Sequence, residues 1–249
     1  MTTKIFLIGS GISYSKSSII QNAALNFLGY SNIIYENYDT YDFQDAFEKL
    51  SSENVLGANV TIPFKEVAGN YFNTSPINTI YKRDSKLLCA STDFQGALKA
   101  IERKLDLNDF DIFIFGSGGA SKSLETGFRN LGFSPKIVSR TGEINYENYL
   151  EYKTKRTLFI NCTPLGTLGK FQEDSPANIF SKDDVVFDLV YNPIKTKMIK
   201  IAEEIGCQTI SGIDMLIFQA IYSLELFLNE ELNFLEIEKV MRKALDKPI

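Results

Sequence analysis

The order of apolar and polar positions predicts alternating strands and helices in the first third of the chain. Short apolar runs indicate strands at residues 4–9, 32–38 and 59–62, because such runs between turn signals are typical of buried strands. Apolar residues at helical spacing predict a helix at residues 17–28, which ends at Gly29. This part of the chain therefore reads as a mixed α/β structure.

A hairpin and a helix are predicted next. Residues 77–91 contain two strand-like runs around a turn at residues 83–85. Residues 95–105 have the apolar spacing of an amphipathic helix, and a polar break at residues 106–109 follows. The pattern changes after this break, so we expect the connection between two domains near residues 97–108.

Beyond residue 110 the strands and helices alternate regularly. Strands are expected at residues 110–115, 135–140, 157–161, 184–190 and 207–211. These strands are apolar almost throughout, which indicates a parallel sheet covered by helices on both faces. Two closing helices are predicted at residues 213–229 and 234–245. The sequence therefore predicts an α/β fold with two domains.

Composition restricts the partners. The chain has 249 residues, of which 44% are hydrophobic, and this is enough to build a substantial core. Its net charge of −5 provides no broad basic face for nucleic acid or an anionic membrane. No apolar run approaches the about 20 residues that a membrane-spanning helix needs, and Met1 to Gly9 are too short for a signal peptide. We expect a cytoplasmic protein that binds a small molecule, and neither nucleic acid nor a membrane.

Cysteine and histidine usage restricts the chemistry. The three cysteines, Cys89, Cys162 and Cys207, are far apart and form no C-x-x-C pair, which disfavours a disulfide framework or a thiolate metal site. The chain contains no His, so it lacks the commonest acid/base residue and the commonest metal ligand. We expect no metal, and proton transfer would depend on Lys, Asp, Glu, Tyr or a thiol.

A glycine loop lies between a predicted strand and a predicted helix. The loop residues are Gly116, Ser117, Gly118, Gly119 and Ala120. With Ser121 in the third place, they fit the dinucleotide fingerprint G-x-G-x-x-small. Glycines at such a turn let backbone N–H groups approach a pyrophosphate at the helix N-terminus. The loop therefore predicts a dinucleotide site.

The end of the next strand indicates which dinucleotide binds. An acidic residue at this place would accept a hydrogen bond from the ribose 2′-hydroxyl of NAD. The chain has Ser139, Arg140 and Thr141 there, and an Arg with two hydroxyls suits a 2′-phosphate. NADP is therefore favoured. Glu143 is close enough to keep NAD as an alternative.

A second dehydrogenase-like pattern occurs at Tyr149 and Lys153. The two residues match the Y-x-x-x-K pattern of short-chain dehydrogenases. In that family the glycine loop opens the chain and the Tyr comes far downstream, whereas here the Tyr follows the loop closely. We interpret this match as accidental.

Taken together, the motifs resemble those of the shikimate dehydrogenase family. The family pattern N-V-T-x-P-F-K is intact at residues 59–65, and D-x-x-Y-x-P-x-x-T is intact at residues 188–196. Further motifs are G-x-P-I-x-H-S-K-S-P as GSGISYSKSS (9–18), V-N-T-L as INTI (77–80), N-T-D-x-x-G as STDFQG (91–96), G-A-G-G-A as GSGGA (116–120), N-R-T as SRT (139–141), N-A-T-x-x-G as NCTPLG (161–166) and G-x-x-M-L-x-x-Q as GIDMLIFQ (212–219). The resemblance covers essentially the whole chain.

Five departures from these motifs bear on the expected site. The replacements are Gly11 and Ser18 for prolines, Tyr14 for His, Ser91 for Asn, and Ile144 for the basic residue that often follows N-R-T. None of them changes Lys65 or Asp93. They affect the expected cofactor preference and substrate affinity more than the reaction type.

The resemblance implies a role for each matching residue. It implies a substrate domain, residues 1–98 with 213–249, and a Rossmann-like NADP-binding domain, residues 99–212. Lys65 and Asp93 would be the catalytic pair. The substrate-binding residues would be Ser15, Ser17, Thr61, Asn78, Tyr191 and Gln219. The cofactor-binding residues would be Gly116, Ser117, Gly118, Gly119, Ala120, Ser139, Arg140, Thr141, Leu189 and Gly212.

The residues themselves fit this chemistry. Interconversion of a ring alcohol and a ketone moves a hydride and a proton, and a Lys–Asp pair is available although the chain has no His. Asp93 can orient the alcohol while Lys65 donates or accepts the proton. Ser15 and Ser17 lie at a predicted helix N-terminus, which is a sensible local site for a substrate carboxylate.

We therefore expect a monomer or homodimer that reversibly reduces 3-dehydroshikimate to shikimate with NADPH, in chorismate and aromatic amino acid biosynthesis. A quinate/shikimate enzyme using NAD is an alternative, but Ser15 and Ser17 favour shikimate because the extra hydroxyl of quinate needs room there. A catalytically silent nucleotide-binding regulator on the same fold is a second alternative, against which Lys65 and Asp93 argue. A methylene-tetrahydrofolate dehydrogenase-like protein is disfavoured by the Ser-x-Ser pattern and Gln219.

Overall fold

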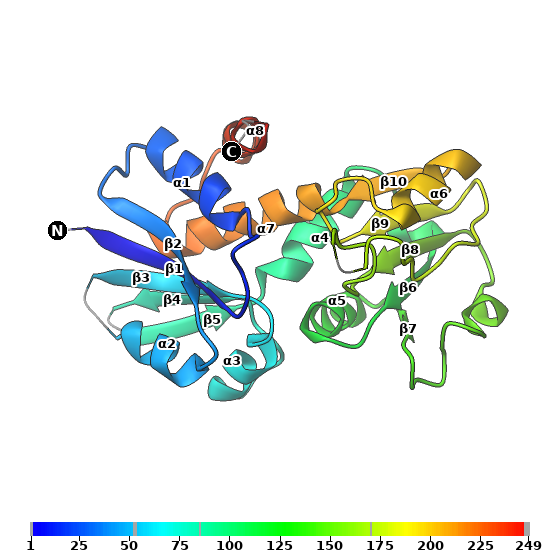
Figure 1. Cartoon of the computed structure of the whole chain (residues 1–249), viewed down its shortest axis with the longest axis horizontal. Coiled ribbons are helices and arrows are strands. Elements are labelled where there is room, and N and C mark those ends of the chain that lie inside the picture. Colours follow the sequence, from blue (N-terminus) through cyan, green and yellow to red (C-terminus); the bar gives the residue numbers. More distant parts are fainter. Residues whose placement is uncertain (1, 52–53, 85, 170, 247–249) are drawn as a thin grey trace. The chain divides into compact units, whose positions relative to one another are not determined.

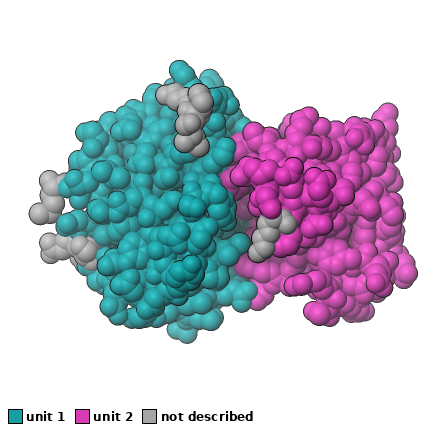
Figure 2. Space-filling view, in the orientation of Figure 1, with its two compact units in different colours: residues 1–96, 216–249 teal, residues 97–215 magenta. Residues whose placement is uncertain are grey.

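Two compact units form the protein (Figure 1). The structure, a computed structural model, describes residues 2–51, 54–84, 86–169 and 171–246. Unit 1 comprises Met1–Gly96 and Leu216–Ile249, and unit 2 comprises Ala97–Met215 (Figure 2). The assignment of substrate binding and dinucleotide binding to the predicted domains stays a prediction.

Unit 1 is built on a five-stranded mixed sheet. Its strands are β1 (Thr3–Gly9), β2 (Ile33–Asp39), β3 (Val55–Val60), β4 (Thr79–Arg83) and β5 (Lys86–Ala90). Their order in the sheet is β2-β1-β3-β4-β5. β1, β2 and β3 run parallel, whereas β4 and β5 form an antiparallel hairpin that extends the sheet beyond β3.

Helices cover both faces of this sheet. They are α1 (Ser17–Phe27), α2 (Phe43–Lys49), α3 (Lys65–Tyr71), α8 (Phe234–Leu245), and parts of α4 (Thr92–Glu102) and α7 (Gly212–Leu228). Figure 1 shows α2 and α3 on one side of the sheet and α1 with α8 on the other. On the α2/α3 side, Phe6 and Ile8 of β1 pack with Phe43 and Phe64 in one buried cluster. Burial of this apolar surface holds the layers together.

Unit 2 is built on a five-stranded parallel sheet. Its strands are β6 (Asp111–Phe115), β7 (Lys136–Val138), β8 (Thr157–Asn161), β9 (Val185–Asp188) and β10 (Gln208–Ser211), in the order β10-β9-β8-β6-β7. The helices are α5 (Gly119–Asn130) and α6 (Lys197–Ile205), with 3₁₀ turns η1 (Leu107–Asp109) and η2 (Tyr149–Tyr152). The central strands β8 and β9 are buried along their whole length, as expected of a sheet covered on both faces.

The predicted α/β class and the parallel sheet beyond residue 110 are confirmed. Several element boundaries were wrong. α4 spans Thr92–Glu102 rather than 95–105, and β7 spans Lys136–Val138 rather than 135–140. The third strand begins at Val55, four residues before the predicted 59, because Val55–Ala58 pairs with β1 although its sequence, VLGA, forms no long apolar run. β9 ends at Asp188 rather than 190, since the chain turns there. Ser85, in the predicted hairpin turn, lies outside the described residues.

None of the helices in the described ranges is both long and apolar enough to cross a membrane.

Candidate functional site

The topology of unit 1 brings most of the predicted substrate and catalytic residues to one end of its sheet. β1 and β3 are parallel, so the loops that follow them leave the sheet at the same edge. β4 runs antiparallel to β3 and therefore begins at this edge, where Thr79 pairs with Asn59 on one side and with Ala90 on the other. Side chains just outside these strand ends, such as Asn78 and Asp93, consequently lie close together.

Lys65 and Asp93 form an ion pair at this end of the sheet. Lys65 is the first residue of α3, and Asp93 lies in the first turn of α4. The Nζ atom of Lys65 is 2.5 Å from Oδ2 of Asp93, and only 17% and 6% of the two side chains are exposed. Opposite charges so close, and so poorly hydrated, interact far more strongly than surface pairs do. The structure thus joins the two predicted catalytic residues, which are 28 positions apart in the chain.

Asn78 links this pair to Gln219. Its Oδ1 accepts the backbone N–H of Thr92 at 2.7 Å, which fixes the orientation of the amide. Its Nδ2 therefore faces the site, 3.1 Å from Oδ1 of Asp93 and 3.2 Å from Oε1 of Gln219. Both oxygens of Asp93 are engaged, one by Lys65 and one by Asn78. Four of the predicted residues thus form one hydrogen-bonded group.

A glycine allows Gln219 to reach this group. A Cβ atom on Gly96 would lie 2.6 Å from the backbone nitrogen of Gln219, so α4 and α7 touch backbone to backbone at this point. Gln219 is itself oriented by a hydrogen bond from its Nε2 to the carbonyl of Leu216 at 2.7 Å. The glycine of the motif STDFQG is therefore required by close packing.

A buried polar network beneath Asn78 was not predicted. Its members are Tyr35, Asn59, Thr79, Thr92 and Ser223, all less than a tenth exposed. The amide of Asn59 donates to Oγ of Ser223 at 2.9 Å and accepts from the hydroxyl of Tyr35 at 2.9 Å. Oγ of Ser223 is also 2.9 Å from Oγ1 of Thr92. In the sequence these residues appear only as polar positions within otherwise apolar segments. The sequence did not show that their side chains contact one another.

The two predicted carboxylate-binding serines lie side by side. Their Oγ atoms are 3.2 Å apart, and the backbone N–H of Ser17 donates to Oγ of Ser15. Ser17 is the first residue of α1, where backbone N–H groups lack helical partners and the helix dipole favours an anion. Two hydroxyls and a helix N-terminus can therefore hold a carboxylate here.

Thr61 adjoins the loop that carries these serines. A Cβ atom on Gly9 would lie 2.6 Å from Cγ2 of Thr61, and the N–H of Ser10 donates to the carbonyl of Ile62 at 3.0 Å. The loops after β1 and β3 are thereby joined. Seven of the predicted residues, including Gln219 of α7, belong to unit 1.

In unit 2 the glycine loop leaves room at the start of α5. Gly116 has a φ of 112°, which side chains rarely adopt, and its N–H donates to the carbonyl of Val138 at 2.8 Å. Gly118 precedes the first helical residue and has an ordinary φ of −85°. A Cβ atom on Gly118 would meet no described atom within 4 Å. Among the described residues, neither the backbone conformation nor close packing demands a glycine at position 118, and the open space fits a phosphate group.

The predicted 2′-phosphate residues follow β7, the strand beside the glycine loop. Ser139 is partly buried, whereas Arg140 and Thr141 are exposed. The bond between Gly116 and Val138 places the loop next to this strand end. Burial raises the pKa of Tyr146, and the cation of Arg140 partly offsets this. Because Arg140 directly follows the end of β7, its positive charge is expected near the adenine ribose.

Leu189 and Gly212 touch each other. A Cβ atom on Gly212 would lie 2.5 Å from the carbonyl oxygen of Leu189, so only glycine lets the chain pass here. Tyr191 belongs to unit 2, in the segment between β9 and α6, while the other predicted substrate residues belong to unit 1.

Asp188 is the centre of a second network that was not predicted. Its buried carboxylate accepts hydrogen bonds from Thr196 Oγ1 at 2.6 Å, Asn161 Nδ2 at 2.8 Å and the N–H of Val190 at 3.0 Å. Burial raises the pKa of Asp188 to about 6, while these hydrogen bonds act in the opposite direction. The bond to Thr196 joins the two ends of the motif at residues 188–196.

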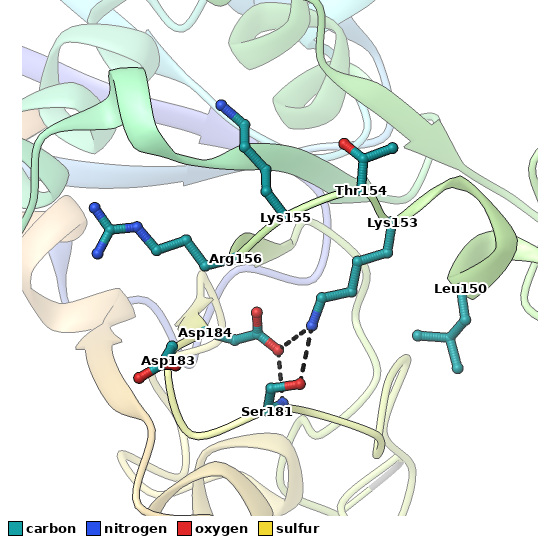
Figure 3. A pocket seen from close by; sticks show the side chains of 8 residues that line it. All are labelled: Leu150, Lys153, Thr154, Lys155, Arg156, Ser181, Asp183 and Asp184. Atoms are coloured by element: carbon teal, nitrogen blue, oxygen red, sulfur yellow. Dashed lines mark hydrogen bonds and ion pairs between the residues drawn. The ribbon is translucent and has the colours of Figure 1, made fainter.

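A hollow of about 400 Å³ lies elsewhere in unit 2 (Figure 3). It is lined by Leu150, residues 153–156, Ser181, Asp183 and Asp184. Most of these residues directly precede β8 and β9, so the hollow lies at the opposite end of the sheet from the glycine loop. Lys153 is paired with the fully buried carboxylate of Asp184 at 2.5 Å. Tyr149 packs edge-on against Phe115 and Phe159. Both members of the Y-x-x-x-K match therefore serve the packing of this unit.

Among the described residues, no three or more Cys, Asp or Glu side chains gather in a way that could hold a metal ion.

Comparison with known proteins places the chain among dehydrogenases. Residues 7–77 match the family model described as the shikimate dehydrogenase substrate binding domain. The chain is 32% identical over 244 residues to a shikimate dehydrogenase (NADP(+)) of Thermococcus kodakarensis, with 89% of each chain covered. A shikimate dehydrogenase solved with NADP+ is 25% identical, with 99% and 96% of the two chains covered and a TM-score of 0.84. The enzyme of Thermus thermophilus, solved with NADP(H) and shikimate, shares the fold at 22% identity and a TM-score of 0.83, covering 98% and 100%.

Proposed function

Because the chain belongs to the shikimate dehydrogenase family, we propose that it catalyses the reversible, NADP-dependent interconversion of shikimate and 3-dehydroshikimate. It is an oxidoreductase that acts on a CH–OH group. The observation that carries the proposal is the Lys65–Asp93 pair, at 2.5 Å and largely shielded from water, in a group completed by Asn78 and Gln219.

The pair can perform the proton transfer. In the direction of ketone reduction, the ammonium group of Lys65 donates a proton to the substrate oxygen as that oxygen gains negative charge. Asp93 accepts a hydrogen bond from the resulting hydroxyl and holds it against Lys65. In the reverse direction Lys65 accepts the proton. The chain has no His that could do this instead.

Neighbouring residues orient the substrate. Asn78 Nδ2 donates to both Asp93 and Gln219, so the three side chains lie together and can provide donors and acceptors for ring hydroxyls. Thr61 lies on the adjoining loop, and Ser15 and Ser17 hold the substrate carboxylate at the start of α1. These contacts exist equally before and during the reaction, so they set affinity rather than rate. Tyr191 stays a predicted substrate contact.

Unit 2 holds the cofactor. When bound, NADP(H) supplies or accepts the hydride. The backbone of residues 116–120 would hold the pyrophosphate at the N-terminus of α5, where Gly118 leaves open space. Arg140 would hold the 2′-phosphate, with Ser139 and Thr141 beside it, and Leu189 and Gly212 would line the remainder of the cofactor site.

The assay that tests the proposal is oxidation of shikimate by the purified protein, followed as NADPH formation. NAD in place of NADP, and quinate in place of shikimate, are measured in parallel. We expect the highest kcat/KM with shikimate and NADP. A higher kcat/KM with quinate and NAD would reverse the assignment, and no turnover with any of the four combinations would favour a catalytically silent protein.

A further inference from the structure

The loop that carries Ser15 is held by an acidic residue on the neighbouring strand. Asp39 is the last residue of β2, and its register partner on β1 is Gly9, which directly precedes the loop. The N–H of Gly11 donates to Oδ1 of Asp39 at 2.8 Å, and the N–H of Ile12 donates to Oδ2 at 3.1 Å. One carboxylate thus binds two consecutive backbone N–H groups, one with each oxygen.

The effect of this contact extends to both serines. The carbonyl of Ile12 accepts the N–H of Ser15 at 2.9 Å, and Oγ of Ser15 accepts the N–H of Ser17 at 3.2 Å. The side chain of Ile12 is itself buried, so this residue is anchored from two sides. A continuous series of short contacts therefore runs from Asp39 through Ile12 to Ser15 and Ser17.

The backbone at Gly11 shows why this anchor is needed. Gly11 has a φ of +65°, and nothing described lies within 4 Å of the place where its Cβ would be. The family motif quoted above has proline at this position. Proline requires a φ near about −65° and has no N–H to donate, so it could form neither this conformation nor the bond to Asp39. Glycine adds freedom to the loop, and the two bonds to Asp39 remove it.

We infer that Asp39 is a positioning residue for the substrate carboxylate, an inference that rests on the proposed function of Ser15 and Ser17. It acts through the loop and not by touching the substrate. Its negative charge would by itself oppose the binding of a carboxylate. Loss of the contacts to the loop would raise the KM for shikimate, whereas loss of the negative charge would lower it. Substitutions of Asp39 can separate these two effects.

The test is steady-state kinetics of Asp39→Ala and Asp39→Asn with shikimate and NADP. Loss of both N–H contacts is expected to raise the KM for shikimate by about 5- to 30-fold, with kcat changed by less than about threefold, because the contacts are made equally in the ground and transition states. Asp39→Asn keeps one acceptor oxygen, so its KM should lie between those of wild type and Asp39→Ala. The KM for NADP should not change.

Asp42→Ala is the matched control. Asp42 is also exposed and also accepts a backbone N–H, that of Gln44 at 2.9 Å, but it caps α2 and does not contact the loop. The control removes the same charge and a bond of the same kind, so its KM for shikimate should stay at the wild-type value. An unchanged or lowered KM in Asp39→Ala, or a KM in Asp39→Asn above that of Asp39→Ala, would overturn the inference.

Hydrogen exchange of the peptide that covers residues 10–17 separates this inference from the proposed function. In Asp39→Ala the amides of Gly11 and Ile12 should exchange faster, whereas in Asp42→Ala they should not. If wild type fails to oxidise shikimate, the proposed function is refuted, and unchanged exchange in Asp39→Ala would refute the anchor as well. Faster exchange together with a raised KM supports both.

Discussion

Substitution of Asp188 by Asn should change how the stability of the protein depends on pH. The Asp188 carboxylate is fully buried at the end of β9, and burial raises its pKa to about 6 although three groups donate to it. An amide has the same shape and cannot ionise. Asp188→Asn therefore leaves the packing in place and removes one titration. The hydroxyl of Thr196 can reorient to accept from the new amide.

The magnitude follows from the difference between the folded and unfolded pKa values. In the unfolded chain the pKa returns to its ordinary 3.8, against about 6 when folded. Between these values the folded protein binds more protons at Asp188 than the unfolded chain does, so the free energy of unfolding falls as the pH rises. A pKa difference of one corresponds to about 1.36 kcal/mol, so the total loss is about 3 kcal/mol. This loss of stability is complete above a pH of about 7.

The assay is urea-induced unfolding of wild type and Asp188→Asn, followed by circular dichroism between pH of about 4 and about 7. Titration of the other carboxylates is common to both proteins and cancels in the difference. The stability of wild type relative to the variant should decrease by about 2.4 kcal/mol over this range, because the carboxyl of the unfolded chain is already partly ionised at a pH of about 4.

A pH-independent difference between the two proteins would refute this reasoning. A difference that moves the other way, with wild type gaining stability as the pH rises, would mean that Asp188 stays ionised. In that case the hydrogen bonds from Thr196, Asn161 and Val190 would outweigh the cost of burial.

Two further substitutions test the substrate and cofactor sites. Ser17→Ala should raise the KM for shikimate by about 10- to 100-fold with little change in kcat, because a hydrogen bond to a charged group is lost in the ground and transition states alike. Ser18→Ala is the control. A loss confined to kcat would contradict the assignment of Ser17 to the substrate carboxylate. Arg140→Ala should lower kcat/KM for NADP by about 10- to 100-fold and leave NAD nearly unchanged. Arg129→Ala, in the last turn of α5, is its control, and equal losses for NADP and NAD would show that Arg140 is structural.

The sequence predicted the elements whose signal is local. β6 is apolar after Asp111 and β8 is apolar between Thr157 and Asn161, because a strand buried on both faces has no polar side. The glycine loop was recognisable because its backbone conformation restricts the residue type, as at Gly116. The fold class and the position of the loop could therefore be predicted from the sequence alone.

The sequence could not show contacts between distant segments. Ser223 resembles any polar residue of a helix, yet it bonds to Asn59, 164 positions away. Asp39 gave no signal either, because its role depends on the backbone of Gly11, 28 positions earlier. The seven-residue helix α3, which begins at Lys65, contains Gly69 and Asn70 and is held by packing of Ala68 rather than by propensity.

The central claim is that Lys65 and Asp93 act as one catalytic unit on shikimate. The most direct test is kcat for shikimate oxidation with NADP in Lys65→Ala, Asp93→Asn and the double variant, after circular dichroism has shown that each is folded. We expect each single change to lower kcat by about 10²- to 10⁴-fold. The kcat of the double variant should be no lower than that of the poorer single variant, because the effects of substituting residues that act as one unit are not additive. Near-normal kcat in folded Lys65→Ala, or losses that multiply in the double variant, would contradict the claim.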